Sequence, residues 1–138
     1  MLFRTWLPKV FAPRPLGEMG ERNAARFLKR HGYTIISTRY RVRYGEIDII
    51  AVDNETVVFV EVKTRRDASL GRGAEAVDTH RQTRLTNAAL AFLKSNGLLE
   101  CASRFDVIEV VWPQHHKKPT INHLRNAFSA VGKGQMYH

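Results

Sequence analysis

Two strand-like segments joined by a very short connection, at residues 46–52 and 56–63, constrain the fold of this chain more than any other feature. They read EIDIIAV and TVVFVEVK, and both are rich in the β-branched and aromatic residues that favour strands. The connection Asp53-Asn54-Glu55 has the residue types of a tight turn. The sequence therefore predicts an antiparallel hairpin, with the core of the domain built around it.

The turn also predicts which residues face each other in the hairpin. If it is centred on residues 54–55, Asp48 lies opposite Glu61. The same register places Glu46 opposite Lys63. Because side chains alternate between the two faces of a strand, all four charged side chains are expected on one face of the sheet.

Opposed carboxylates in an apolar setting are unfavourable unless a cation lies between them or one of them takes up a proton. Magnesium would resolve the conflict, since it uses only one or two protein carboxylates and takes its other ligands from water and phosphate. The alternative is that Glu61 and Lys63 mark the solvated end of a strand, with Glu46 and Lys63 in a weak surface ion pair. The metal interpretation accounts better for three acids and a lysine on one face of an apolar hairpin.

Other elements follow from periodicity and from helix start and stop signals. Helices are predicted over residues 17–31 and from 78 or 79 to 97, and further strands over 33–42 and 104–112. A short final helix or turn is expected over 121–131, packing Ile121, Leu124 and Phe128 on the domain. The predicted class is α/β, with a mixed β-sheet flanked by helices in the order αβββαβ.

Helical spacing places Glu21 on the inward stripe of the first helix, seven residues before Leu28. A carboxylate in the first turn of a helix also complements the helix dipole. From the spacing alone, Glu21 is either a member of the acidic site or an ordinary first-turn acid.

Charge predicts the partner. Lysine and arginine number 22 against 13 aspartates and glutamates, a formal net charge of +9, so a polyanion such as nucleic acid is expected. Arg39, Arg41 and Arg43 alternate with aromatic and apolar residues and suit phosphate contact, although a solvated strand face is a simpler explanation. The remaining candidates for nucleic-acid contact are in a glycine-bearing loop and the first turn of the second helix: Arg65, Arg66, Arg72, Arg81, Gln82 and Arg84.

The composition also bounds the setting. No apolar run approaches the roughly 20 residues of a membrane span, so no membrane partner is expected. Cys101 is the only cysteine, which excludes a disulfide framework and indicates a reducing compartment such as the cytoplasm. Residues 1–15 are expected to form a flexible basic arm, with a surface anchor as the second option. Residues 16–130 would form one domain, followed by a frayed tail at 131–138.

The order of these residues resembles a known superfamily. Asp48 followed by Glu61-Val62-Lys63, after a helix bearing Gly20-Glu21, resembles the PD-(D/E)XK nucleases, particularly their Holliday junction resolvase-like branch. Across residues 17–130 the chain is similar to the YraN-like family of bacterial proteins in five blocks, namely GERNAARFLKRHGY, GEIDIIA, VFVEVKTR, RFDVIEV and HLRNAF.

The resemblance implies a restriction endonuclease-like core and a Mg²⁺- or Mn²⁺-dependent endonuclease acting on DNA, in particular branched or junction DNA. The metal ligands would be Asp48, Glu61 and the Val62 carbonyl. Lys63 would activate water, and Glu21 would complete the site directly or through water. Relatives of the resolvase branch act as homodimers, which makes a homodimer an expectation here.

Two positions depart from the pattern. The first half of the nuclease signature reads Ile47-Asp48 rather than proline-aspartate, a common variation that leaves the metal site intact. The residue before Gln82 is Arg81, where lysine is expected in this family. The arginine-rich strand and loop also keep a second hypothesis open, in which the chain is a nonenzymatic nucleic-acid-binding or assembly protein that has kept the fold without turnover.

Overall fold

The computed structural model describes residues 15–67 and 77–131. The predicted basic arm and tail lie outside the described residues, apart from Pro15 and Val131. Arg72 and the central part of the glycine-bearing loop also lie outside them. No helix in the described ranges combines the length and apolar character needed to cross a membrane.

A five-stranded mixed sheet forms the centre of the fold, in the order β1-β2-β3-β4-β5. Its strands are β1 (Thr34–Val42), β2 (Gly45–Asp53), β3 (Thr56–Arg65), β4 (Ser103–Val111) and β5 (Thr120–Phe128). β3 and β4 are parallel, and the other neighbouring pairs are antiparallel. The parallel pair requires a crossover, and the helix between β3 and β4 supplies it. The predicted α/β class, with a mixed sheet flanked by helices, is confirmed.

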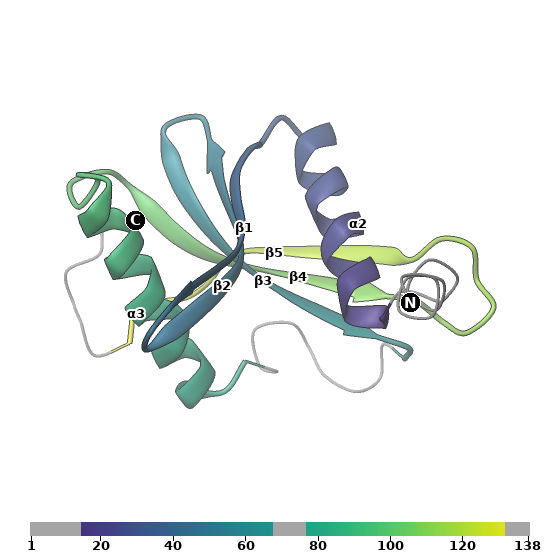
Figure 1. The fold of residues 1–138 in the computed structure, drawn as a ribbon. Coiled ribbons are helices and arrows are strands. Elements are labelled where there is room, and N and C mark those ends of the chain that lie inside the picture. The colour runs from purple at the N-terminus through teal and green to yellow at the C-terminus, as the bar shows by residue number, and fades with distance from the viewer. Residues whose placement is uncertain (1–14, 68–76, 132–138) are drawn as a thin grey trace, which may run out of the picture.

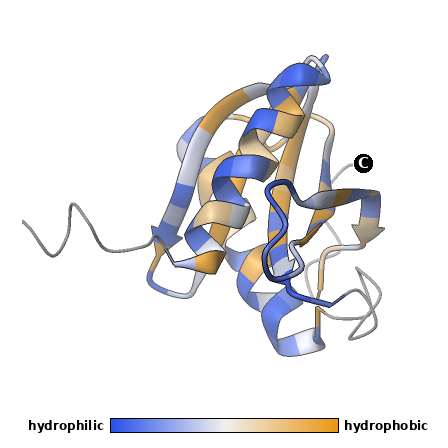
Figure 2. Ribbon diagram, turned by 90° about the vertical axis from the view of Figure 1, so that its right-hand side faces the viewer, coloured by the Kyte–Doolittle hydropathy of each residue, from blue (hydrophilic) through white to orange (hydrophobic). Residues whose placement is uncertain are grey.

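The two helices of the described residues cover opposite faces of this sheet (Figure 1). They are α2 (Leu16–Arg30) and α3 (Thr79–Ser95). Hydrophobic and hydrophilic residues alternate along α2 (Figure 2), and its buried residues are Gly20, Ala24 and Leu28. α3 begins at Asp78, whose side chain accepts a hydrogen bond from the Arg81 N–H, and this cap fixes where the helix starts.

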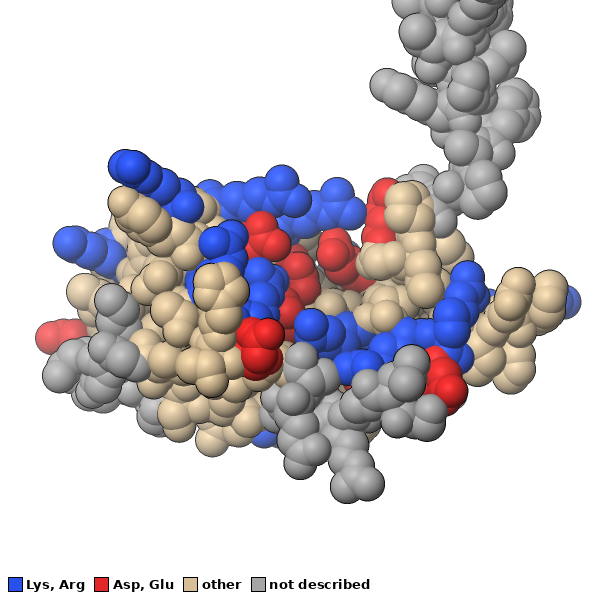
Figure 3. Space-filling model, turned by 90° about the horizontal axis from the view of Figure 1, so that it is seen from below, with Lys and Arg blue, Asp and Glu red and all other residues tan. Residues whose placement is uncertain are grey.

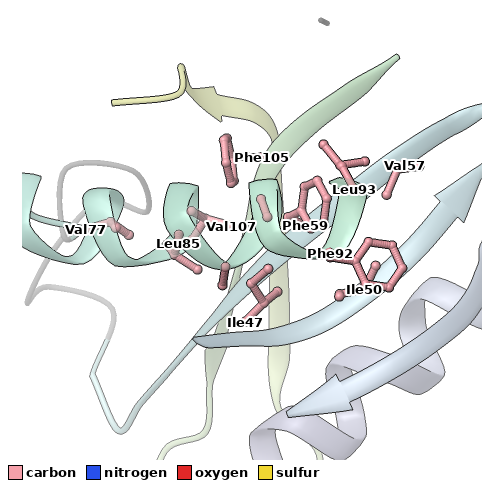
Figure 4. Packing of buried hydrophobic residues seen from close by; sticks show 12 residues of the cluster. Ile47, Ile50, Val57, Phe59, Val77, Leu85, Phe92, Leu93, Phe105 and Val107 are labelled. Carbon is pink, nitrogen blue, oxygen red and sulfur yellow. The ribbon is translucent and has the colours of Figure 1, made fainter. Parts of the chain in front are cut away.

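A separate apolar core lies on each face of the sheet. On the α3 face, Phe59 and Phe105 from adjacent strands meet Leu85 and Phe92 from the helix (Figure 4). On the α2 face, Leu28 packs against side chains of β2, β3 and β4. The central strands are therefore buried on both sides, which explains the nearly continuous apolar run in β3.

The hairpin of β2 and β3 forms as predicted around its turn. Asn54 has a φ of 56°, a left-handed conformation that asparagine tolerates well. The ladder runs from Asp53 opposite Thr56 to Ile49 opposite Val60, which is the predicted register. It ends there, so the expected backbone pairs of residue 48 with 61 and of 46 with 63 are not formed.

The prediction of a short final helix or turn over 121–131 was wrong, because most of this segment belongs to the edge strand β5. Its apolar residues have helical spacing, but a bulge in the strand produces that spacing. Leu124 and Phe128 are four residues apart and pair with Val107 and Phe105, which are only two apart. Asn126, with a φ of 51°, lies within this irregular stretch.

Two glycines set how closely the helices approach the sheet. A Cβ added at Gly20 would collide with the Thr64 side chain, and one at Gly45 would collide with the backbone carbonyl of Arg84. α2 therefore packs directly on β3, and β2 begins directly against α3. In each case the next residue is acidic, so these contacts carry Glu21 and Glu46 toward the same end of the sheet.

Candidate functional site

Asp48 lies at the point where β2 and β3 stop pairing. Its Oδ2 accepts a hydrogen bond of 2.8 Å from the Val62 N–H, which holds the carboxyl group over β3. Asp48 also lines two adjoining hollows of about 310 and 260 Å³, both of which include Glu21 and Arg39. Aspartate and glutamate side chains gather within a hollow of the surface, with lysine and arginine around them (Figure 3).

Glu61 is buried beside Asp48 and is held by a cation from α3. The Arg81 guanidinium donates to both carboxylate oxygens of Glu61, with N–O distances of 2.8 Å each. The same guanidinium lies 3.4 Å from Glu46, and the Lys63 ammonium lies 3.7 Å from Glu61. The three acids and the lysine of the hairpin thus converge as the sequence indicated, with Arg81 among them.

The two neighbouring carboxyl groups have opposite pKa shifts. Burial and the nearby charge of Glu61 raise the pKa of Asp48 to about 8, against the opposing effect of the Val62 N–H. Burial also acts against the charged form of Glu61, but hydrogen bonds from Arg81 and Asp48 outweigh it and lower the Glu61 pKa. At neutral pH Asp48 therefore holds a proton that it shares in a hydrogen bond with the Glu61 carboxylate.

Glu21 enters the site from α2, on the other side of Asp48. Its Oε1 lies 3.0 Å from the Arg39 Nε, and this hydrogen bond raises the pKa of Arg39. Glu21 also adds to the negative potential that raises the pKa of Asp48. The structure therefore places all four predicted catalytic residues together, with Asp48 between Glu21 and Glu61.

The carboxyl groups of the site suit a divalent cation that needs few protein ligands, such as Mg²⁺. In the ranges 15–67 and 77–131 there is no group of three or more histidine, cysteine, aspartate or glutamate residues arranged to hold a metal. Asp48 and Glu61 provide two carboxyls in mutual contact, and magnesium commonly takes no more than that from a protein. A cation between them would replace the shared proton. The third expected ligand is the Val62 carbonyl, and the N–H of the same residue donates to Asp48.

Four of the seven described arginines that were expected to bind nucleic acid are in ion pairs instead. Arg41 lies 3.8 Å from Glu46, and Arg65 lies 3.3 Å from the buried Glu109. Arg81 is held by Glu61, as described above. The alternating face of β1 is interrupted because Arg39 has a φ of 53°.

The other predicted contacts are dispersed. Arg43 packs its guanidinium over the Tyr44 ring and lines a hollow beside α3. Gln82 donates to the Val77 carbonyl and so supports the turn before α3. Arg66 donates to the Trp112 carbonyl, and Arg84 lies partly exposed on α3.

One buried polar cluster was not predicted. Asp106, on β4, is fully buried and accepts hydrogen bonds from Arg104, from the His123 ring and from the Asn126 N–H. These partners lower the pKa of Asp106 although burial acts in the opposite direction. An aspartate between apolar strand residues was a usable signal, but His123 was assigned to a helix and its pairing with β4 could not be seen.

The comparisons with known proteins identify relatives of this chain. The profile described as "Uncharacterised protein family UPF0102" matches residues 20–110. A UPF0102 protein of Rhodopirellula baltica is 43% identical over 88% of this chain and 75% of its own length. UPF0102 proteins of Trichlorobacter lovleyi and Alkaliphilus metalliredigens are each 44% identical, over 82% and 83% of this chain and 89% and 98% of their own lengths.

Two solved structures have a partly similar shape. Archaeoglobus fulgidus Hjc, a Holliday junction resolvase from an archaeal hyperthermophile, is 17% identical, with a TM-score of 0.45 over 80% of this chain and 97% of that chain. The SPO1766 protein of unknown function from Silicibacter pomeroyi is 16% identical, with a TM-score of 0.38 over 80% of this chain and 72% of that chain.

Proposed function

The chain belongs to Uncharacterised protein family UPF0102, as its YraN-like blocks implied, and on that premise we propose that it is a divalent-metal-dependent nuclease acting on DNA. One observation carries the proposal. Asp48 and Glu61 lie together beside Lys63, and while Arg81 and Lys63 pair with Glu61, Asp48 relieves the remaining repulsion by taking up a proton. A structural role alone gives no reason to keep such a pair, whereas a cation-binding role requires it.

The two carboxyls would hold Mg²⁺ or Mn²⁺, with Asp48 giving up its proton and Glu61 keeping its charge. When bound, such a cation polarises a phosphate oxygen and lowers the pKa of water. The hydrogen bond from the Val62 N–H keeps Asp48 oriented toward the hollow in either protonation state. Glu21 would add a carboxylate on the α2 side, directly or through water.

In this proposal Lys63 assists hydrolysis. Its ammonium is 3.7 Å from Glu61, and its side chain is 31% exposed, so it reaches both the acids and solvent. A cation placed there can orient the attacking water and stabilise charge that develops on the phosphate. Branched or junction DNA is the substrate that the resemblance to resolvases favours.

A cleavage assay with matched variants tests the proposal. Purified protein is incubated with flap, four-way junction, duplex and single-stranded DNA in Mg²⁺ or Mn²⁺. We expect metal-dependent cleavage that falls at least about a hundredfold in Asp48→Asn and in Lys63→Met. Glu55→Gln, which removes an exposed acid at the hairpin turn, serves as the control and should cleave like wild type. Cleavage that survives Asp48→Asn would refute this assignment.

A second candidate function follows from Arg81. Because its guanidinium bonds both oxygens of Glu61, the acid site has an internal cation. This favours a nucleic-acid-binding protein that does not cleave. In that case DNA binding would be salt-sensitive but unaffected by metal and by Asp48→Asn. Calorimetric titration of Mg²⁺ or Mn²⁺ into wild type and Glu61→Gln separates the two functions, since only the nuclease requires Glu61-dependent metal binding.

A further inference from the structure

A row of arginines runs along the outer face of α2. Arg22, Arg26 and Arg30 are four residues apart and exposed, so they lie on one side of the helix at intervals of about 6 Å. They are not on the stripe that packs on the sheet, where Ala24 and Leu28 are buried. The row begins one residue after Glu21, next to the acid site.

The connection between β4 and β5 completes a basic groove beside this row. One hollow, of about 260 Å³, is lined by Arg22, Arg26 and Trp112 together with Met19 and Asn23. The next, of about 350 Å³, is lined by Arg26 and Arg30 from α2 and by Trp112, Lys117 and Lys118 from the connection. We name these five cations and Trp112 the α2 groove.

Trp112 is the wall that both hollows share, and its position is fixed. Its indole N–H donates to the His116 carbonyl over 2.8 Å. The backbone N–H of Trp112 donates to the Arg65 carbonyl, and the Trp112 carbonyl accepts from the Arg66 guanidinium. A partly buried ring held in this way loses little conformational entropy when a flat ligand stacks on it.

The cations of the α2 groove differ from those near the acids. Within residues 15–67 and 77–131, the recorded ion pairs include Arg39, Arg41, Arg65 and Arg81. None of those ion pairs involves a cation of the α2 groove. Among the described residues, the α2 groove therefore brings together five cations that take no part in these ion pairs.

From these observations we propose that the α2 groove binds a single-stranded nucleic-acid segment, with phosphates on its cations and a base stacked on Trp112. An aromatic ring between basic walls is the pattern that single-strand sites use, because stacking accepts any base. Arg22 lines both this groove and the hollow that contains Asp48, so the two sites are continuous. The groove's role as a path for substrate rests on the proposed nuclease function, whereas its binding does not.

The test measures binding of a fluorescent oligothymidylate in EDTA, so that cleavage plays no part. Arg26→Ala/Arg30→Ala is compared with Lys29→Ala/Lys94→Ala, which removes the same charge from exposed helical positions that do not line the groove. We expect the first variant to bind about tenfold more weakly and to reduce the salt slope by about 1.4. The second variant should stay within about threefold of wild type. Equal losses in both variants, or no loss in either, would overturn the proposal.

The stacking step has its own readout. The chain has two tryptophans, Trp6 and Trp112, so Trp6→Phe leaves Trp112 as the sole reporter. We expect oligothymidylate to quench its fluorescence and Trp112→Leu to weaken binding about tenfold. An unchanged Trp112 signal at saturation overturns the proposal. So does a response only to phosphatidylserine-containing vesicles, which would identify a membrane-surface site.

Failure of this proposal is distinguishable from failure of the proposed function. If the α2 groove binds in EDTA and no substrate is cut in metal, the nuclease assignment fails and the groove stands. If cleavage depends on Asp48 but is unaffected by Arg26→Ala/Arg30→Ala, and binding is also unaffected, the groove proposal fails and the nuclease stands. Urea unfolding midpoints of all variants confirm that each is folded.

Discussion

Asp48 and Asp106 have similar backbone settings and opposite electrostatic ones. Each is an inward aspartate of a central strand, and each accepts one backbone N–H, from Val62 over 2.8 Å and from Asn126 over 2.9 Å. Each also lies next to an interruption in its strand pairing. The difference is the next partner, because Asp106 meets an arginine and a histidine whereas Asp48 meets the carboxylate of Glu61.

The comparison separates a structural acid from a reactive one. A buried carboxylate with cationic partners, such as Asp106, is stabilised in its charged form, and its pKa is lowered as a result. A half-buried carboxylate beside another carboxylate is stabilised by taking up a proton or a cation, and its pKa is raised for that reason. The residue type of an aspartate and its place in a central strand therefore do not distinguish the two roles, but its neighbours do.

The largest expected effect comes from removing the satisfied acid. Asp106→Ala leaves Arg104, whose side chain is only 15% exposed, with Asp53 as its remaining carboxylate. It also removes the acceptor of the His123 ring and of the Asn126 N–H. We expect a loss of about 3–5 kcal/mol in the free energy of unfolding, measured with urea. Asp48→Asn is the control and should leave stability about equal, because the asparagine amide can donate to Glu61 in place of the Asp48 proton and still accept from the Val62 N–H. Similar losses in both variants would show that the two acids are not different in kind.

The extent to which the sequence predicts these roles depends on the range of each contact. The Asp48–Glu61 proximity was predictable because a short turn and the alternation of strands fix it locally. Arg81 at Glu61 was not, since it depends on how α3 approaches β2 at Gly45 after a loop of irregular sequence. The Asp106 cluster was missed because a bulge gave β5 the spacing of a helix.

Divalent metal should give the next largest effect, an increase in stability that occurs only in proteins that keep Asp48. Binding to the folded state at a concentration a hundredfold above the dissociation constant stabilises a protein by about 2.7 kcal/mol. We expect Mn²⁺ to raise the melting temperature of wild type and of Asp106→Asn, but not of Asp48→Asn. The shift should be larger at pH 8.5 than at pH 6, because the cation must displace the Asp48 proton. Equal shifts in wild type and Asp48→Asn would show that the metal binds elsewhere.

The pH dependence of stability should have opposite signs at the two acids. Asp48 in the folded protein keeps its proton up to about pH 8, whereas in the unfolded chain it loses it near about pH 4. The folded state thus binds more protons in this window, so stability falls as pH rises through it. Asp106 has a lowered pKa, so its contribution is present above about pH 4 and is lost as pH falls below it.

This prediction is measured as the difference in unfolding free energy between wild type and each aspartate-to-asparagine variant. Between pH 5 and 8 the wild type should lose more than about 1 kcal/mol relative to Asp48→Asn. Relative to Asp106→Asn it should show no such decline, and its advantage should shrink only in acid. A flat difference for Asp48 would contradict the shared proton and, with it, the reason for expecting a cation.

The smallest expected effect tests whether the contrast extends to the rim of the acid site. Arg41 lies 3.8 Å from Glu46, and its side chain is 73% exposed, so water screens the pair. We expect Arg41→Ala to change the unfolding free energy by less than about 0.5 kcal/mol. Arg81→Ala should cost more, because it removes two hydrogen bonds from the buried Glu61. If the two variants cost the same, the Glu61 pair is as solvated as the rim, and the Asp48 carboxyl has no buried partner to share its proton with.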